Sequence, residues 1–156
     1  MSPAITFRRA TIHDINKVRL LELELVAFEQ QIVPSLKQSG EIHYYNIPAI
    51  LADEDRSMLL LLEANGELAG CGLGQIRINK EYYQETYFGY IGLMSLKPAF
   101  RGKGLGPRII NELLAWFRTK EIKEVKLKVF SNNDAAMASY KKVGFTELMT
   151  EMRMDL

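Results

Sequence analysis

Apolar and polar positions in the first third of the chain predict one strand and two helices. Residues 5–11 predict a strand, and apolar residues then recur at helical spacing from Ile15 to about Gln31. Thr11 and Asp14 have the spacing of a capping box, so we expect the helix to begin there. After a stretch punctuated by proline and glycine, residues 47–55 predict a second, shorter helix.

The middle of the chain predicts a hairpin and one further strand. Residues 57–78 form two apolar runs about Asn65 and Gly66, and Asn-Gly between such runs is a strong hairpin signal. The alternate glycines of the second run, Gly70, Gly72 and Gly74, favour close packing on one strand face over a ligand site. A polar loop then leads to a strand over 86–97, which Pro98 ends.

The last third predicts two helices and two strands. An apolar stripe running to about Lys120 indicates a helix, and residues 124–130 alternate as a strand. Residues 133–144 predict a last helix with Gly144 just past its end, and residues 147–156 predict a strand that closes the sheet. We find no linker or repeat, so residues 1–156 are interpreted as a single domain.

Composition narrows the setting without naming a function. The 156 residues are 47% hydrophobic and 25% charged, as in an ordinary globular domain. No apolar run approaches the roughly 18 residues of a membrane span, and the N-terminus lacks the pattern of a signal peptide. Cys71 is the single cysteine, interpreted as a small buried filler, and no metal-ligand cluster is evident. We therefore expect a cytoplasmic protein with no metal and no membrane partner.

Charge is nearly balanced overall but uneven along the chain. The net charge of +1 argues against a dedicated nucleic-acid binder, and Lys126 and Lys128 are interpreted as one solvated strand face. Residues 1–85 hold 12 acidic and 8 basic side chains, whereas residues 86–156 hold 7 and 12. Either this is scatter over solvated surfaces, or one half meets a polyanion and the other a cation.

The stretch "FRGKGLGPRII", residues 100–110, joins a strand to the mouth of a helix. A helix N-terminus has unpaired N–H groups and a partial positive charge, and glycines let a phosphate approach it closely. The spacing fits neither a nucleoside-triphosphate P-loop nor a dinucleotide fingerprint. The simpler alternative is a glycine-rich turn that only starts a helix.

Two motifs together resemble the GNAT superfamily of N-acetyltransferases. Arg101, Gly104 and Gly106 match the pattern Gln/Arg-x-x-Gly-x-Gly/Ala of the acetyl-CoA pyrophosphate loop, and "NDAAMASYKKVGF" is similar to the second motif of the family. The predicted order of elements also agrees with that of the family. The resemblance implies an α/β (α+β) fold: a mixed, mostly antiparallel sheet flanked by helices.

The resemblance further implies acetyl-CoA as co-substrate and places the residues that hold it. The main chain of one strand would pair with pantetheine and polarise the acetyl carbonyl, the glycine loop would hold pyrophosphate, and the last helix would pass the pantetheine arm. These residues are Leu93, Met94, Ser95, Leu96, Arg101, Gly102, Lys103, Gly104, Leu105, Gly106, Asn133, Ala136 and Tyr140.

The implied chemistry is direct attack of a neutral amine on the thioester, through a tetrahedral intermediate and without an acyl-enzyme. Tyr140 would act as general acid towards the departing sulfur. The strand over 86–97 has no acidic residue where relatives often place a base, so the candidates are Glu85, Glu29, or a water chain reaching Ser95 or a tyrosine. His13 and His43 are interpreted as surface or structural.

We therefore expect an acetyl-CoA-dependent N-acetyltransferase acting on a primary amine of a small molecule, with a homodimer as one candidate assembly. The alternative is a non-catalytic acyl-CoA sensor on the same scaffold. Carboxylates interleaved with tyrosines favour a cationic acceptor, unless they only solvate the surface. These residues are Glu22, Glu24, Glu29, Glu41, Glu81, Glu85, Tyr44, Tyr45, Tyr82 and Tyr83.

Overall fold

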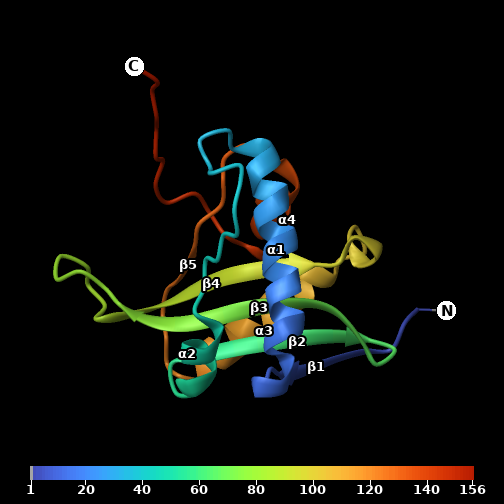
Figure 1. Cartoon of the computed structure of the whole chain (residues 1–156). Coiled ribbons are helices and arrows are strands. Elements are labelled where there is room, and N and C mark those ends of the chain that lie inside the picture. Colours follow the sequence, from blue (N-terminus) through green and yellow to red (C-terminus); the bar gives the residue numbers. More distant parts are fainter. Residues whose placement is uncertain (1) are drawn as a thin grey trace.

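A five-stranded sheet with helices on both faces forms the body of the computed structural model, which describes residues 2–156 (Figure 1). The strands lie in the order β1-β2-β3-β4-β5; the first four pair antiparallel, and β5 runs parallel to β4. This confirms the expected mixed, mostly antiparallel α/β fold. The strands are β1 (Ile5–Arg9), β2 (Ser57–Ala64), β3 (Glu67–Ile78), β4 (Tyr87–Leu96) and β5 (Val125–Leu127), and the helices are α1 (Ile15–Ile32), α2 (Ile47–Ala52), α3 (Leu105–Thr119) and α4 (Asp134–Val143).

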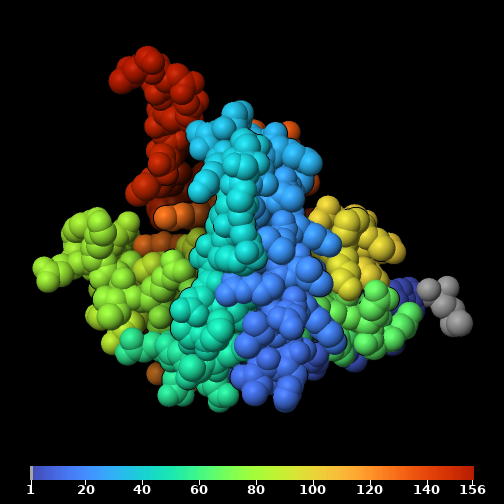
Figure 2. All heavy atoms as spheres, in the orientation of Figure 1, coloured from blue at the N-terminus to red at the C-terminus, as the bar shows by residue number. Residues whose placement is uncertain are grey.

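Each face of the sheet carries its own hydrophobic core. Successive side chains of a strand point to opposite faces, so the continuous apolar run of β2 supplies both cores. Helices α1 and α2 cover one face, where Val18 and Leu21 pack with Leu73 and Leu93. Helix α3 covers the other face, where its apolar stripe packs against Leu60, Leu62 and Ile91. The segment 33–46 lies along α1 over the first of these faces (Figure 2).

The predicted capping box at the start of α1 is confirmed, within a short 3-10 turn (Ile12–Asp14) that leads into the helix. The Thr11 hydroxyl accepts from the His13 N–H at 3.3 Å, and the Asp14 carboxylate accepts from the Thr11 N–H at 2.8 Å. Both oxygens of Asp14 also accept from the Arg8 guanidinium, at 2.8 and 2.9 Å. Hydrogen bonding to Arg8 holds the pKa of Asp14 well below its usual range.

The glycines of β3 are packing residues, as the sequence indicated. A Cβ built at Gly72 would lie 2.5 Å from Ile109 Cγ2, and one at Gly74 would lie 3.1 Å from the Phe117 ring. Helix α3 therefore approaches the sheet closely because this face of β3 is bare. The Asn65-Gly66 hairpin is also confirmed, with left-handed φ values of 51° and 79°.

The prediction of a closing strand over 147–156 is wrong. Residues 145–156 contain no strand, and the tail runs away from the body into solvent (Figures 1 and 2). Its alternating apolar residues include Met149, Met152 and Met154, which are 79%, 89% and 82% exposed. The preceding strand is also shorter than the expected 124–130, because β5 pairs with β4 over only three residues. Across residues 2–156, no helix has the length and apolar character needed to cross a membrane.

Candidate active site

A β-bulge interrupts β4 at Leu93. Along the β3–β4 ladder, Leu73 pairs with Gly92 and Cys71 pairs with Ser95, so Gly72 alone stands opposite two residues. Leu93 has a left-handed φ of 47°, uncommon for a residue with a side chain. Such bulges bend a strand and re-aim its backbone groups.

Strands β4 and β5 part next to the bulge. Their parallel pairing runs from Gly89–Val125 to Ile91–Leu127 and then ends, within the part of the chain that the structure describes. The Leu93 N–H therefore has no partner on β5 and donates instead to the Tyr45 hydroxyl at 3.2 Å. The parting of the strands thus leaves a backbone donor outside the sheet ladder, bonded to a side chain instead.

The glycine loop joins the end of β4 to α3. Gly102 and Gly104 have left-handed φ values of 72° and 71°, and a Cβ built at either would meet no atom within 4 Å. Arg101 ties this loop to β4, because its Nε donates to the Leu96 carbonyl at 2.9 Å. Helix α3 begins at Leu105, so the loop lies at a helix N-terminus, whose unpaired N–H groups suit a phosphate. Gly106 and Pro107 lie in the first turn of α3.

Helix α4 lies beside the first turn of α3, where a Cβ at Gly106 would be 3.8 Å from Ser139 Oγ. The Asn133 side chain caps α4 by accepting from the Ala136 N–H at 3.3 Å, which leaves its amide NH₂ outside the cap. Tyr140 packs edge-on against Phe145, with ring centroids 6.2 Å apart. Burial, followed by the negative charge of Glu29, raises the pKa of Tyr140 to about 12.

Glu29, near the C-terminal end of α1, is the predicted base whose charge acts on Tyr140. Burial raises the pKa of Glu29, while hydrogen bonding with the Tyr44 hydroxyl lowers it. The charge of Glu29 is also among the causes that raise the pKa of Tyr44, Tyr45 and Tyr140. A half-buried carboxylate therefore lies among phenols from the loop 33–46 and from α4.

The other two base candidates lie in different surroundings. Glu85 precedes β4, pairs with Lys123 at 3.3 Å and lines a hollow of about 340 Å³ with Tyr83 and Glu124. The stretch of β4 from its first residue to Leu93 is about 20 Å at the rise of an extended strand, so the structure does not bring Glu85 to the bulge. The hydroxyl of Ser95 is buried and donates to the Leu21 carbonyl at 2.9 Å.

The burial of Cys71 bears on its predicted role. Cys71 is fully buried, and burial raises the pKa of its thiol to about 12, which confirms the interpretation as a filler.

The expectation of a solvated face at Lys126 is wrong. Its Nζ lies 3.8 Å from the Tyr83 ring centroid and donates to Asn79 Oδ1 at 3.1 Å, because the β3–β4 loop folds over it.

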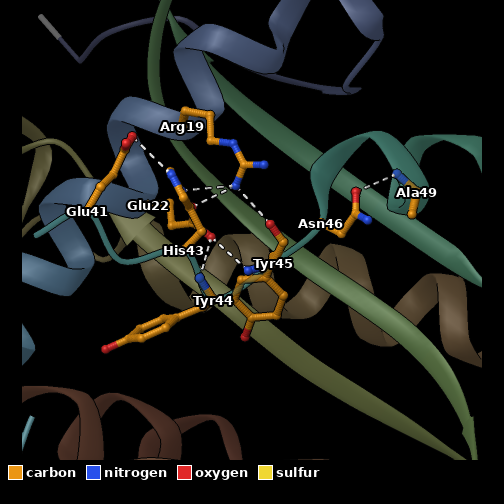
Figure 3. A network of polar contacts seen from close by, with 8 residues as sticks. All are labelled: Arg19, Glu22, Glu41, His43, Tyr44, Tyr45, Asn46 and Ala49. Carbon is orange, nitrogen blue, oxygen red and sulfur yellow. Dashed lines mark hydrogen bonds and ion pairs between the residues drawn. The ribbon is translucent and has the colours of Figure 1, made fainter. Parts of the chain in front are cut away.

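The sequence placed Glu22 and Tyr45 only in a general acidic and aromatic surface, and the structure gives them specific roles (Figure 3). Glu22 is fully buried and holds the backbone of Tyr44 and Tyr45, and it also pairs with His43, which is thereby structural. The Tyr45 hydroxyl reaches Leu93. Nothing in the sequence pattern links positions this far apart along the chain.

The chain belongs to the Acetyltransferase (GNAT) family, whose model matches residues 18–145. This confirms the resemblance carried by the two motifs. Among curated relatives, N-alpha-acetyltransferase RimI of Mycobacterium tuberculosis is 42% identical over 52 residues, which is 33% of this chain and 31% of that protein. The matched stretch therefore spans about a third of that relative.

Solved structures share the fold over nearly the whole chain. A mutant of the BH1408 protein from Bacillus halodurans matches with a TM-score of 0.85 at 19% identity, covering 97% of this chain and 99% of that one. A predicted acetyltransferase from Clostridium acetobutylicum, solved with acetyl-CoA, matches with a TM-score of 0.74 at 17% identity, covering 97% and 96%. At these identities the likeness shows the fold.

Proposed function

We propose that the protein is an acetyl-CoA-dependent N-acetyltransferase that moves the acetyl group directly to a primary amine of a small molecule. The observation that carries this proposal is the opening between β4 and β5. It leaves the Leu93 N–H outside the sheet ladder, on the strand that leads into the glycine loop. The charge of Glu29 also acts on Tyr140. Membership of the GNAT family supports the same activity.

The residues present fit acetyl-CoA. The amides from Gly102 to Gly106 would hold the pyrophosphate, with Arg101 and Lys103 adding positive charge. The main chain from Leu93 to Leu96, beyond the last β4–β5 pair, would bind the pantetheine amides. On α4, the small Ala136 side chain leaves room for the arm, and the NH₂ of Asn133 can donate to it.

The chemistry follows from the placement of two groups. Glu29, ionised, accepts a proton as the amine nitrogen forms a bond to the carbonyl carbon and the carbonyl electron pair moves to oxygen. The Leu93 N–H donates to that oxygen. When the pair returns and the carbon–sulfur bond breaks, the Tyr140 hydroxyl donates to the departing sulfur. Glu29 and Tyr140 would thus act as base and acid in successive steps of one acetyl transfer.

A small acceptor with a second positive charge is the class that we favour. Glu29 lies among phenols, and a cation would gain from ion pairing and cation–π contact there, each worth about 1 kcal/mol when partly exposed. Of the other acidic candidates, Glu85 pairs with Lys123 and Glu41 with His43, whereas the charge of Glu29 acts on Tyr140. Arg77, stacked on Tyr90 at 3.7 Å, opposes a cation from the β3 side.

A screen of acceptors by CoA release tests the proposal. Small polyamines and aminoglycosides should be acetylated faster than neutral or acidic amino acids, and the advantage should shrink at high salt. Calorimetry with acetyl-CoA alone separates the alternatives. Binding without turnover of any amine would favour the non-catalytic sensor, and no binding at millimolar acetyl-CoA would exclude both.

A further inference from the structure

Glu22 is a buried carboxylate that grips the chain at Tyr44 and Tyr45 (Figure 3). One of its oxygens accepts from the Tyr44 and Tyr45 N–H groups, at 3.2 and 3.0 Å. The other accepts from Arg19 Nη1 at 2.9 Å and lies 3.1 Å from His43 Nδ1. Because a buried charge without partners is strongly disfavoured, this arrangement holds the loop in one conformation.

Arg19 binds the carbonyl group of the same residue, Tyr45, whose N–H is bound by Glu22. The nitrogen that donates to Glu22 also donates to the Tyr45 carbonyl at 2.8 Å. The N–H and C=O of Tyr45 are therefore both fixed to α1 by charged side chains. Because the backbone of Tyr45 is fixed at both its N–H and its C=O, the direction of its Cα–Cβ bond is fixed as well.

The Tyr45 ring reaches the bulge of β4. Its hydroxyl accepts from the Leu93 N–H at 3.2 Å. The neighbouring residue has no side chain, and a Cβ built at Gly92 would lie 2.3 Å from the Tyr45 oxygen. The bulge therefore has room for this hydroxyl because position 92 is a glycine.

We propose that Tyr45 is a further catalytic residue that donates its O–H to the acetyl carbonyl oxygen beside the Leu93 N–H, and that Glu22 positions it. This inference rests on the proposed function. As the carbonyl oxygen takes the Leu93 N–H, the Tyr45 oxygen ceases to accept that bond and its O–H turns to the same oxygen. The developing negative charge then has two donors, and Tyr45 keeps its proton throughout.

The surroundings of the hydroxyl suit a donor. Burial is the largest cause that raises the pKa of Tyr45 to about 12, while the Leu93 N–H and the charge of Arg77 lower it. The hydroxyl therefore carries its proton throughout the neutral range. A preorganised donor of this kind contributes only where charge develops, so its loss should affect turnover more than binding.

Tyr45→Phe tests the donor, because it removes one oxygen and leaves the ring. We expect kcat to fall about 100-fold, while KM for acetyl-CoA changes less than about threefold. Tyr87→Phe, at an exposed position at the start of β4, is the matched control and should leave kcat unchanged. An unchanged kcat in Tyr45→Phe, with wild-type enzyme turning over normally, would overturn the role of Tyr45.

Glu22→Gln tests the positioning role in a double-mutant cycle. If Glu22 acts through Tyr45, Glu22→Gln should lower kcat in the wild-type background and should add little in the Tyr45→Phe background. The cycle pairs Glu22 with Tyr45 itself, so it needs no variant of Tyr44. A merely structural Glu22 would lower the melting temperature and leave kcat of the folded fraction unchanged, or would add its full effect to Tyr45→Phe.

The Leu93 amide resonance provides a readout that does not depend on turnover. Saturating acetyl-CoA should shift this resonance in the wild type more than CoA does, because CoA lacks the carbonyl. Tyr45→Phe alone should also shift it, since the resting partner is gone. If the protein turns over no amine, the proposed function fails but this shift still decides whether the carbonyl reaches Leu93. Equal shifts with acetyl-CoA and CoA would overturn the inference.

Discussion

Burial controls the protonation of the acid at Tyr140. Because its pKa is raised to about 12, the phenol stays protonated up to about pH 10, and only its hydroxyl is needed at the sulfur. We predict that Tyr140→Phe lowers kcat on the order of 10²-fold and leaves acetyl-CoA binding within about twofold, since the ring remains. Steady-state kinetics and calorimetry measure the two effects. Unchanged kcat, under conditions where chemistry limits the rate, would make Tyr140 a packing residue.

The same phenol predicts a feature of the pH profile. An ordinary tyrosine begins to ionise above about pH 9, whereas one with a pKa of about 12 is still protonated at about pH 10. The kcat profile should therefore show no fall assignable to Tyr140 between about pH 7 and pH 10. A measured alkaline fall that disappears in Tyr140→Phe would contradict the raised pKa.

Glu29 should lower the stability of the folded state above the carboxyl pH range while it supports catalysis. Its raised pKa means that the folded state binds this proton more tightly than the unfolded state, so the contribution of Glu29 to stability falls as pH rises through the carboxyl range. We predict that Glu29→Gln lowers kcat/KM at least about 100-fold and leaves the melting temperature at pH 8 unchanged or higher. Thermal melts at pH 4 and pH 8 measure how the difference in melting temperature between Glu29→Gln and the wild type changes with pH. Glu112→Gln, on the exposed face of α3, is the control.

At the scale of elements, the N-terminus of α3 should decide cofactor binding. Gly104→Asp places a carboxylate where the phosphates would lie, and we predict that it abolishes the rise in melting temperature that acetyl-CoA gives the wild type. Gly104→Asn is the matched control, because it has the same shape without the charge and both residues tolerate the left-handed φ of 71°. Equal loss in the two variants would assign the effect to backbone strain instead.

The N-terminus of α1 should depend on one carboxylate. Asp14→Asn weakens both the cap on Thr11 and the pair with Arg8, and we predict a loss of about 2 kcal/mol in the free energy of unfolding at pH 7. Since the pKa of Asp14 is depressed, its contribution is present above about pH 4 and is lost as pH falls further. Urea titrations at pH 7 and pH 3 should show the gap between wild type and variant closing. Asp55→Asn, in an exposed turn, should show no gap.

At the scale of the whole molecule, the exposed tail bears on assembly. A homodimer is one candidate assembly, and the apolar side chains of Met149, Met152 and Met154 are a surface that a second copy would cover. We predict that replacing these three with serine shifts a dimer towards monomer in light scattering, without changing the circular dichroism. Ile12→Ser, at an exposed apolar position on the body, is the control. A wild type that is monomeric at every concentration contradicts the prediction.

Features that depend on a few neighbouring residues could be predicted from the sequence. The Asn65-Gly66 turn, the cap at Thr11 and the end of α4 at Gly144 follow from local backbone preferences and local hydrogen bonds. The glycine loop and the α4 motif are equally local, so they indicated the family before any contact was known. Hydrophobic periodicity added the order of strands and helices.

Packing of the elements against one another settled which groups meet. The predicted closing strand needed a partner edge as well as a suitable sequence, and the three residues of β5 do not pair with the tail. Glu29 and Glu85 are the same residue type, so the sequence alone does not choose between them as the base. In the structure, the length of β4 separates Glu85 from the bulge at Leu93. The contacts from Glu22 to Tyr44 and from Tyr45 to Leu93 join segments 22 and 48 residues apart. Such contacts form because packing α1 on the sheet brings the segments together, and no local pattern in the sequence encodes that distance.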